Sequence, residues 1–443
     1  MYKRKIEQFF LAWKSNPQHK PLIVKGCRQC GKTSSVLAFA YAHYKHVIYI
    51  DFHEQPELQS LFEATLTVDY LTVAISAAIP GATFVPNQTC LILDEIQDCP
   101  KARASLKFFM RDGRYDVICT GSLLGVNGYM SDAMQARYEQ ASIPVGAETI
   151  VDMYPMDFEE WLWANQVPAE AVGILQQALQ AETPVPEAIH QRMRQLFLEY
   201  IIVGGMPEVV GTYLQTRDTN QVIAVQRAII EGYKADMIKY AKAEDKVRIR
   251  ECFESIPRQL SRDNKKFTYS VVRKGGRSSQ YVSSLQWIVD AGIVHRCNNL
   301  TLPELPLSGN AMPDSFKIYM ADSGLFISLL DDGTQWDILN NNLGAYKGAI
   351  YENVVADIFG KMGKKLYYFQ KTDGIEIDFV IRYWGECVPV ECKAKTGNAK
   401  SLRTVLAHPE KYHIKHAIKL GDYNVGREKQ TLTLPMYMAF LLQ

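Results

Sequence analysis

Residues 26–33 read GCRQCGKT and fit the spacing G-x-x-x-x-G-K-T. In such a loop, Gly26 and Gly31 let the backbone curl so that successive N–H groups point at phosphate oxygens. Lys32 reaches the β- and γ-phosphates, and the Thr33 hydroxyl ligates Mg²⁺. A helix that begins near Lys32 would aim its positive end at the same phosphates. The motif therefore predicts binding of ATP with Mg²⁺.

The whole loop is expected to contact the nucleotide. The expected contacts along it are Gly26, Cys27, Arg28, Gln29, Cys30, Gly31, Lys32, Thr33 and Ser34. The alternative is a glycine-rich turn that binds nothing. It is disfavoured because an apolar run precedes the loop and a helical pattern follows it.

A second apolar run, TCLILDE at residues 89–95, ends in two carboxylates. Asp94 is placed to hold the Mg²⁺, and Glu95 is the natural base to polarise an attacking water. Glu95 and Lys32 are thus the expected catalytic residues, which implies hydrolysis of ATP. The alternative is an acidic cap on a buried strand.

A third strand is expected at residues 115–119, followed by Thr120, Gly121 and Ser122. Thr120 and Ser122 could each contact the γ-phosphate or the water. The alternative is a Gly-Ser turn without a catalytic role. Strands that alternate with helices predict an α/β fold with a parallel sheet, whose ligands bind at the carboxyl ends of the strands.

Length and composition limit the number of domains and the class of protein that the chain can form. At 443 residues, two or three domains are expected. A formal net charge of +1 with 47% hydrophobic residues indicates a soluble globular protein, so any nucleic-acid contact must be a local patch. The N-terminus lacks the apolar core of a signal peptide, and the least polar stretch, residues 71–85, is too short to span a bilayer. No membrane contact is expected.

The cysteines are odd in number and scattered, which favours a reducing, cytoplasmic setting. Cys27 and Cys30 form a C-x-x-C, but they lie inside the phosphate loop. Coincidence explains this pair most simply. The alternative is a redox brake on ATP binding.

Changes in periodicity and charge predict four parts: 1–153 as the ATPase domain, 154–243 as a helical lid, 244–300 as a winged helix, and 301–443 as a nuclease-like domain. The segment 246–297 is rich in Arg and Lys. Its pattern reads as three helices, with a turn at Gly275-Gly276, that lead into a hairpin.

The third of these helices would present its polar start to the major groove of double-stranded DNA. The residues expected to contact DNA are Arg273, Lys274, Arg277, Ser278 and Gln280. The alternative is a winged helix used only for packing or for contacts with protein partners.

A second chemical signal lies near the C-terminus. Glu391 and Lys393 share one face of the expected strand CVPVECK, and Asp378 interrupts the apolar strand GIEIDFVIR. Glu352 lies on the apolar stripe of the helix before them, where a carboxylate is costly unless it is paired or bound to metal. Glu352, Asp378 and Glu391 could converge on Mg²⁺ while Lys393 orients a water. This is the D-(x)n-[DE]-x-K pattern of restriction-type nucleases; the alternative is a fold whose carboxylates make structural ion pairs.

Together these residues resemble the prokaryotic AAA-like P-loop ATPases of the archaeal-ATPase type. That family carries a C-terminal domain of unknown function with a nuclease-like, PD-(D/E)xK core. The loop resembles the family's G-x-R-Q-x-G-K-T. Further similar segments are LILDEIQ (91–97), TGS (120–122), YPMDFEEW (154–161), VGGMPEVV (203–210), YMADSGL (319–325) and GAIYEN (348–353). The resemblance implies an ATPase core, a helical lid, a winged helix and a nuclease-like terminus.

The chain departs from the family at residues 142–148, SIPVGAE, where the family usually has Arg or Lys after the glycine. This chain has Ala147 there, so hydrolysis could be slow or depend on another cation. Arg111, Arg114 and Arg137 are candidate substitutes.

The leading functional hypothesis is an ATP-hydrolysing switch that acts on DNA or is regulated by it, with a C-terminal domain that could be a metal-dependent nuclease. One alternative is a signalling scaffold that assembles with partner proteins when ATP is bound. Another is a DNA-binding regulator with a vestigial ATPase and an inactive nuclease-like domain.

Overall fold

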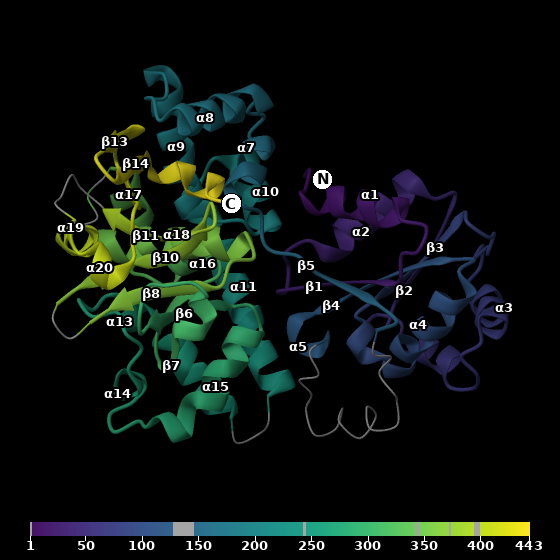
Figure 1. Ribbon diagram of the computed structural model, residues 1–443. Helices are drawn as coiled ribbons and strands as arrows, with labels where there is room; N and C mark the ends of the chain where they lie inside the picture. Colours follow the sequence, from purple (N-terminus) through teal and green to yellow (C-terminus); the bar gives the residue numbers. More distant parts are fainter. Residues whose placement is uncertain are drawn as a thin grey trace. The chain divides into compact units, whose positions relative to one another are not determined.

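The computed structural model describes residues 2–126, 146–241, 245–340, 342, 346–371, 374–393 and 399–443. The chain divides into two compact units, which are described separately (Figure 1). The first comprises Met1–Pro155, Gly232–Lys246 and Asp290–Gly292, and the second Met156–Glu231, Val247–Val289 and Ile293–Gln443. The end of the first unit lies close to the boundary expected at residue 153. The three later parts share the second unit, apart from two short segments.

The first unit is built on a five-stranded parallel sheet with the order β2-β3-β4-β1-β5. Its strands are β1 (Leu22–Gly26), β2 (His46–Asp51), β3 (Thr89–Asp94), β4 (Asp116–Ser122) and β5 (Thr149–Asp152). Every residue of β3 is buried, as expected for a central strand of a parallel sheet that is covered on both faces. This arrangement is the α/β fold of P-loop NTPases.

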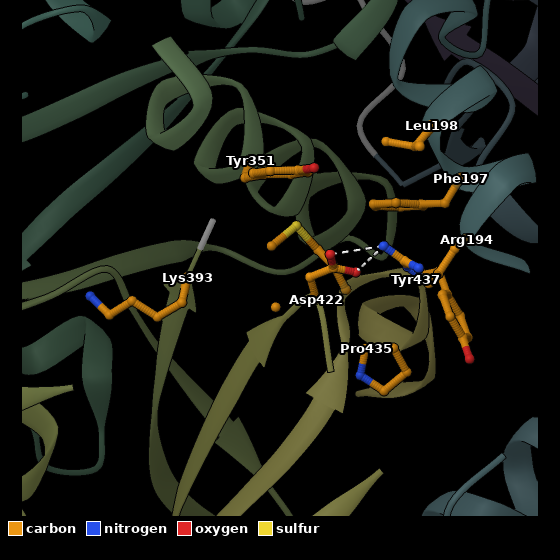
Figure 2. A pocket seen from close by; sticks show the side chains of 10 residues that line it. Arg194, Phe197, Leu198, Tyr351, Lys393, Asp422, Pro435 and Tyr437 are labelled. Atoms are coloured by element: carbon orange, nitrogen blue, oxygen red, sulfur yellow. Dashed lines mark hydrogen bonds and ion pairs between the residues drawn. The ribbon is translucent and has the colours of Figure 1, made fainter. Parts of the chain in front are cut away.

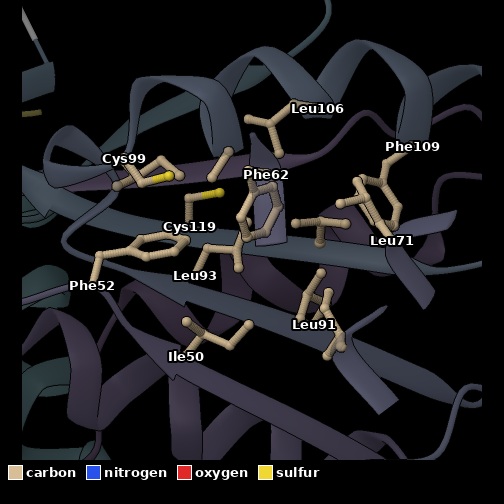
Figure 3. Packing of buried hydrophobic residues seen from close by; sticks show 14 of the residues in the cluster. Ile50, Phe52, Phe62, Leu71, Leu91, Leu93, Cys99, Leu106, Phe109 and Cys119 are labelled. Carbon is tan, nitrogen blue, oxygen red and sulfur yellow. The ribbon is translucent and has the colours of Figure 1, made fainter. Parts of the chain in front are cut away.

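Helices cover the sheet. They are α1 (Ile6–Ser15), α2 (Lys32–His43), α3 (Val68–Ala78), α4 (Pro100–Asp112) and α5 (Leu123–Val126), with short 3-10 turns η1 (Pro56–Phe62) and η2 (Ile96–Asp98). Helices α3 and α4 pack on one face, where Leu71 and Leu106 meet Leu91 and Leu93 of β3 (Figure 3). This apolar core fixes the strands whose ends carry the predicted site.

The second unit begins with the helices α7 (Phe158–Ala164), α8 (Ala169–Ala181), α9 (Glu187–Val203), α10 (Pro207–Thr216) and the first part of α11 (Thr219–Tyr240), whose residues from Gly232 on belong to the first unit. The segment YPMDFEEW contains a capping box. Asp157 accepts a hydrogen bond from the backbone of Glu160 at 2.9 Å, and its own N–H donates to the Glu160 carboxylate at 3.0 Å. The helices lie where the lid was predicted, and their role as a lid stays a prediction.

The basic segment forms four helices where three were expected, because the first expected helix is divided at Ser255. They are α12 (Lys246–Glu254), α13 (Ile256–Leu260), α14 (Tyr269–Val272) and α15 (Ser278–Asp290), and they lead into the antiparallel pair β6 (Val294–Leu300) and β7 (Ala311–Met320), with η3 (Leu307–Asn310) between these strands. Strand β6 also pairs in parallel with β8 (Leu366–Gln370). The boundary expected at residue 300 therefore falls inside a continuous sheet, because both neighbours of β6 belong to the following part.

The remaining elements form two sheets, β7-β6-β8-β9 and β10-β11-β12-β14-β13. Their further strands are β9 (Glu376–Ile377), β10 (Phe379–Tyr383), β11 (Glu386–Lys393), β12 (Ala417–Gly421), β13 (Gly426–Glu428) and β14 (Thr431–Pro435). The helices of this part are α16 (Ser323–Ser328), α17 (Thr334–Leu339), α18 (Lys347–Lys361), α19 (Lys400–Ala407), α20 (Pro409–Tyr412) and the 3-10 turn η5 (Met436–Leu441). Helix α18 packs against strands of both sheets. In the described part of the chain, no helix combines the length and the apolar character needed to cross a membrane.

A buried charge cluster holds α9, α16 and α18 together. The Lys361 ammonium donates to Asp357 at 2.9 Å, to Tyr200 at 3.0 Å and to Asp322 at 3.4 Å. Asp322 also accepts the backbone N–H of Gly205 at 2.7 Å. The segments VGGMPEVV and YMADSGL therefore meet here, which gives them a structural role.

Candidate functional site

The predicted phosphate loop lies at the carboxyl edge of the first sheet. Strand β4 pairs with both β1 and β3, so the loop after β1, Asp94 at the end of β3 and Thr120 near the end of β4 are neighbours. Gly31 has a φ of 95°, which favours glycine. A Cβ on Gly26 would lie 2.2 Å from the carbonyl oxygen of Met153, so a side chain cannot fit there. The two glycines of the motif are thus required by the backbone.

Asp94 is the centre of a hydrogen-bonded group. Its carboxylate accepts from the Thr33 hydroxyl at 2.8 Å, from the Tyr49 hydroxyl at 2.9 Å, and from the Thr120 hydroxyl. Burial raises the pKa of Asp94, while the bonds from Thr33 and then Tyr49 work against the rise. A carboxylate beside a hydroxyl is a set of hard oxygen donors, which suits Mg²⁺. The residues present therefore fit the metal that accompanies ATP.

Two buried cations hold the loop. The Lys32 ammonium donates to the carbonyl oxygens of Gly26 at 3.2 Å and Cys27 at 3.0 Å. The Arg4 guanidinium donates to the carbonyl oxygens of Cys30 at 2.9 Å and Tyr154 at 2.6 Å. The Lys32 ammonium thus lies inside the curved loop, where it could pair with a phosphate that binds there.

Glu95 follows Asp94 in the left-handed region, with a φ of 51°. This conformation costs a non-glycine residue roughly 1–2 kcal/mol, and such strain tends to occur at functional sites. Its carboxylate accepts a hydrogen bond from the amide of Gln97. The Gln97 Oε1 atom is buried and has no hydrogen-bond partner among the described residues. Gln97 therefore orients Glu95 and keeps one free acceptor beside it.

Other predicted nucleotide contacts are placed differently. The Arg28 side chain forms an ion pair with Asp236, and the Tyr233 hydroxyl donates to the Arg28 carbonyl oxygen at 3.3 Å. The Ser122 hydroxyl accepts the N–H of Gly125 at 3.1 Å, as expected for a Gly-Ser turn without a catalytic role. Ser34 is exposed. Of Thr120 and Ser122, Thr120 is the one bound to Asp94.

The thiols of Cys27 and Cys30 are buried and interact directly. The contact with Cys27, helped by the charges of Lys32 and Arg4, lowers the pKa of Cys30 to about 6. The contact with Cys30 and burial raise the pKa of Cys27. Redox control of ATP binding through this pair stays a hypothesis.

Two of the three arginines that could replace the missing basic residue lie at the edge of the sheet away from the phosphate loop. They therefore cannot reach a nucleotide bound to their own molecule. Arg114 precedes β4 and pairs with Asp112 and Asp69, and Arg111 lies in the last turn of α4. Both are therefore at the amino edge of the sheet, opposite the phosphate loop. Arg137 lies outside the described residues. Ala147 is buried and offers no charge.

The sequence reasoning missed three residues here. Tyr49 and Gln97 hold the two carboxylates, and Arg4 fixes the loop from the N-terminal segment. The role of Tyr49 could have been predicted from the strand pattern. Tyr49 and Asp51 lie on the same face of β2, and Asp51 lies beside Asp94 in the paired strand β3.

The residues predicted to contact DNA are all exposed, namely Arg273, Lys274, Arg277, Ser278 and Gln280. The Arg273 guanidinium lies 3.6 Å from Glu251, with most of its side chain in solvent. Exposure is what a phosphate contact needs, but it does not by itself identify a partner.

The carboxylates predicted to form a second metal site do interact. Burial raises the pKa of Asp378, and the charges of Glu352 and Glu391 raise it further. Burial also raises the pKa of Glu391. Asp378 accepts the N–H of Cys392 at 2.8 Å. Glu352 of α18, Asp378 and Glu391 therefore lie close enough to influence one another's ionisation.

Lysine side chains lie among these carboxylates and form ion pairs with them. Lys265 donates to Glu352 at 2.7 Å, and the fully buried Lys317 lies 3.8 Å from Glu352 and 2.8 Å from Glu376. Burial works to raise the pKa of Glu352, but Lys317 and then Lys265 bring it below its usual value.

Lys393 is paired with Glu391 at 2.5 Å. Within the described ranges, no group of three or more His, Cys, Asp or Glu residues could hold a metal ion. The predicted nuclease-type metal site does not fit a metal as it stands, because lysine ammonium groups pair with Glu352 and Glu391.

Three family models match parts of the chain. Residues 18–162 match an AAA domain. Residues 194–335 match "Domain of unknown function (DUF8612)" and residues 347–438 match "Domain of unknown function (DUF4143)". The C-terminal match agrees with the resemblance in placing a domain of unknown function there, and it leaves the nuclease-like core unconfirmed. No curated protein matches the chain.

Solved structures show distant likeness. The Walker-type ATPase PABY2304 of Pyrococcus abyssi is 15% identical, with a TM-score of 0.44, over 74% of this chain and 96% of that one. AMPPCP-bound DnaA from Aquifex aeolicus is 10% identical, with a TM-score of 0.22, over 64% of this chain and 84% of that one. Drosophila ORC bound to GC-rich DNA and Cdc6 is 12% identical, with a TM-score of 0.22, over 48% of this chain and 92% of that one. These structures carry no assignment: what is shown is that residues 18–162 match the AAA domain and have the phosphate-loop geometry of a P-loop NTPase fold.

Proposed function

We propose that this protein hydrolyses ATP and uses the nucleotide state as a switch that acts on DNA or is regulated by it. One observation carries the proposal. Thr33, Asp94 and Thr120 form a single hydrogen-bonded group beside Lys32, and Glu95 follows directly at the same strand end.

Each residue has a distinct task in this mechanism. Bound Mg²⁺ would neutralise charge on the phosphates, and Thr33 and Asp94 are the residues that would hold it. Lys32 stabilises the charge that develops on the transferred phosphate oxygens. Glu95 accepts a proton from the attacking water, and Gln97 keeps the Glu95 carboxylate in place. Tyr49 and Thr120 fix the orientation of Asp94 from the two neighbouring strands.

Glu95→Gln is expected to slow ATP hydrolysis strongly while ATP still binds. The amide keeps the shape of the side chain but cannot accept the proton, and a general base contributes roughly 10²–10⁴-fold to the rate. Phosphate release gives kcat, and fluorescent ATP gives the affinity. The exposed Glu57→Gln on the same unit is the matched control. Turnover that is unchanged by Glu95→Gln would remove Glu95 as the base. A variant that instead accumulates as a stable ATP-bound assembly with partner proteins would favour the scaffold hypothesis.

The DNA part of the proposal depends on the basic segment 246–277 and the exposed start of α15. We propose that α12 to α15 with β6 and β7 act as a winged helix, and that Arg273 and Lys274 meet DNA phosphates. The order of the helices and the hairpin supports this reading.

For the C-terminal part, Lys317 favours the inactive alternative. We propose that this domain has a nuclease-like core in which ion pairs replace the metal, so that it binds and does not cleave. A buried lysine within 3.8 Å of two carboxylates supplies the positive charge that a divalent cation would bring.

Wild-type protein is therefore expected not to nick plasmid DNA with Mg²⁺ or Mn²⁺, with or without ATP. The measurement is conversion of supercoiled to open-circular plasmid over hours. Lys393→Ala serves as the paired sample, because a contaminating nuclease would act equally in both preparations. Cleavage by the wild type that is lost in Lys393→Ala would show that the site is a working nuclease.

A further inference from the structure

An open cavity lies at the carboxyl ends of the parallel strands β11, β12 and β14 (Figure 2). Lys393, Gly421 and Pro435 are level with one another at these ends, and all three line the cavity. The cavity is open to solvent on one side. The carboxyl ends of parallel strands are where α/β sheets bind their ligands. The cavity thus has the place of a ligand site.

Aromatic and apolar groups form most of its wall. Phe197 comes from α9, Tyr351 from α18, and Tyr437 from η5. The Tyr437 hydroxyl is hydrogen-bonded to Nδ1 of His190 at 2.8 Å, which holds this ring in place. Phe197 and Tyr437 are buried, so the half-buried Tyr351 is the ring that can offer a face to a flat, apolar ligand.

One edge of the cavity is polar. The Arg194 guanidinium forms an ion pair with the Asp422 carboxylate, with contacts of 2.6 and 2.8 Å (Figure 2). Their side chains are 35% and 43% exposed, so both can reach a ligand. Guanidinium N–H groups donate and carboxylate oxygens accept, and here they stand side by side. The ligand that matches must carry acceptors and donors on the edge of a flat ring.

We propose that this cavity binds a nucleobase, from either a free nucleotide or an unpaired nucleotide of a strand. The base stacks on Tyr351, the one of the three rings that is only half-buried, and meets Arg194 and Asp422 with its polar edge. The site is separate from the phosphate loop, and its residues all belong to the second unit. It also borders the ion-paired acids through Lys393, which pairs with Glu391.

The test uses full-length protein with Lys32→Ala, so that the phosphate loop does not contribute. AMP, GMP, CMP and UMP are titrated by calorimetry, and labelled single-stranded dodecamers by fluorescence anisotropy. Stacking of a base on an aromatic ring predicts a loss of about tenfold in affinity for Tyr351→Ala. Asp422→Asn is expected to change the ranking of the four bases. Tyr346→Ala on the exposed N-cap of the same helix is the control.

Mononucleotide binding that falls in Tyr351→Ala would identify a free nucleotide as the ligand. Binding confined to the dodecamers, with the same loss, would identify a strand. No binding of either probe, or binding that neither Tyr351→Ala nor Asp422→Asn alters, overturns the proposal. Thermal unfolding of each variant excludes misfolding as the cause. Because the background carries Lys32→Ala, failure here is distinct from failure of ATP hydrolysis.

Discussion

Lys32→Ala is expected to abolish ATP turnover and to weaken ATP binding. The Lys32 ammonium lies within the loop, bonded to the carbonyl oxygens of Gly26 and Cys27, and only 8% of the residue is exposed. Its charge is thus held ready for the phosphates, with little reorganisation needed. Loss of one preorganised group that stabilises transition-state charge costs roughly 10²–10³-fold in kcat. Phosphate release and binding of fluorescent ATP measure the two effects.

The exposed Lys45→Ala in the same unit is the control for a general loss of charge. DNA affinity is measured for wild type and Lys32→Ala, each with and without ATP. The switch predicts that ATP changes DNA affinity in the wild type and has no effect in Lys32→Ala. Equal DNA affinity in all four samples would favour a DNA-binding regulator with a vestigial ATPase. Retention of full ATPase activity by Lys32→Ala would contradict the assigned site.

The nucleotide site could be predicted because its signals are local in sequence. The loop at residues 26–33 specifies a strand before it and a helix after it, and the structure has β1 and α2 there. The run HVIYID corresponds to β2 from His46 to Asp51, and Asp94 ends β3 as expected. Buried parallel strands are short apolar runs, so their limits are visible in the residue types.

Contacts between distant residues could not be predicted in the same way. Lys265 and Lys317 pair with acids 87 and 59 residues further along the chain, and no spacing rule relates them. The alternation of β11 put Glu391 and Lys393 on one face, but it could not show that Lys317 from β7 is present too. The strand pattern could not reveal the lysines beside Glu352, because the net charge around an acid depends on every element that packs beside it.

Lys361→Met is expected to destabilise the second unit more than any exposed substitution. It removes the only cation bonded to Asp322 and Asp357 among the described contacts, and leaves two carboxylates at 1% exposure or less. Breaking a buried ion pair by removing one partner costs about 3–5 kcal/mol. Urea unfolding followed by circular dichroism measures the loss. Lys365→Met on the exposed surface is the control. A loss below about 1 kcal/mol would show that the cluster does not hold the fold.

The same cluster should make stability depend on pH through Asp357. Burial raises the pKa of Asp357 to about 7, against the opposing charge of Lys361, whereas its ordinary value is 3.8. The folded state therefore favours the protonated acid. Its contribution to stability is complete below pH 3.8 and is lost as the pH rises through 7. Lys361 pairs with both Asp322 and Asp357, so the cluster is neutral only when one of the two carboxylates is protonated.

Between pH 5 and 8, the wild type is accordingly expected to lose stability relative to Asp357→Asn, whose amide is always neutral. Urea unfolding at pH 5, 6, 7 and 8 gives the comparison, and the exposed Asp337→Asn should follow the wild type. Parallel curves for the wild type and Asp357→Asn would mean that Asp357 is ionised in the folded protein throughout this range. At pH 8, Asp357→Asn should also recover part of the stability lost in Lys361→Met, because the neutral amide removes the cost of protonating or burying the Asp357 carboxylate.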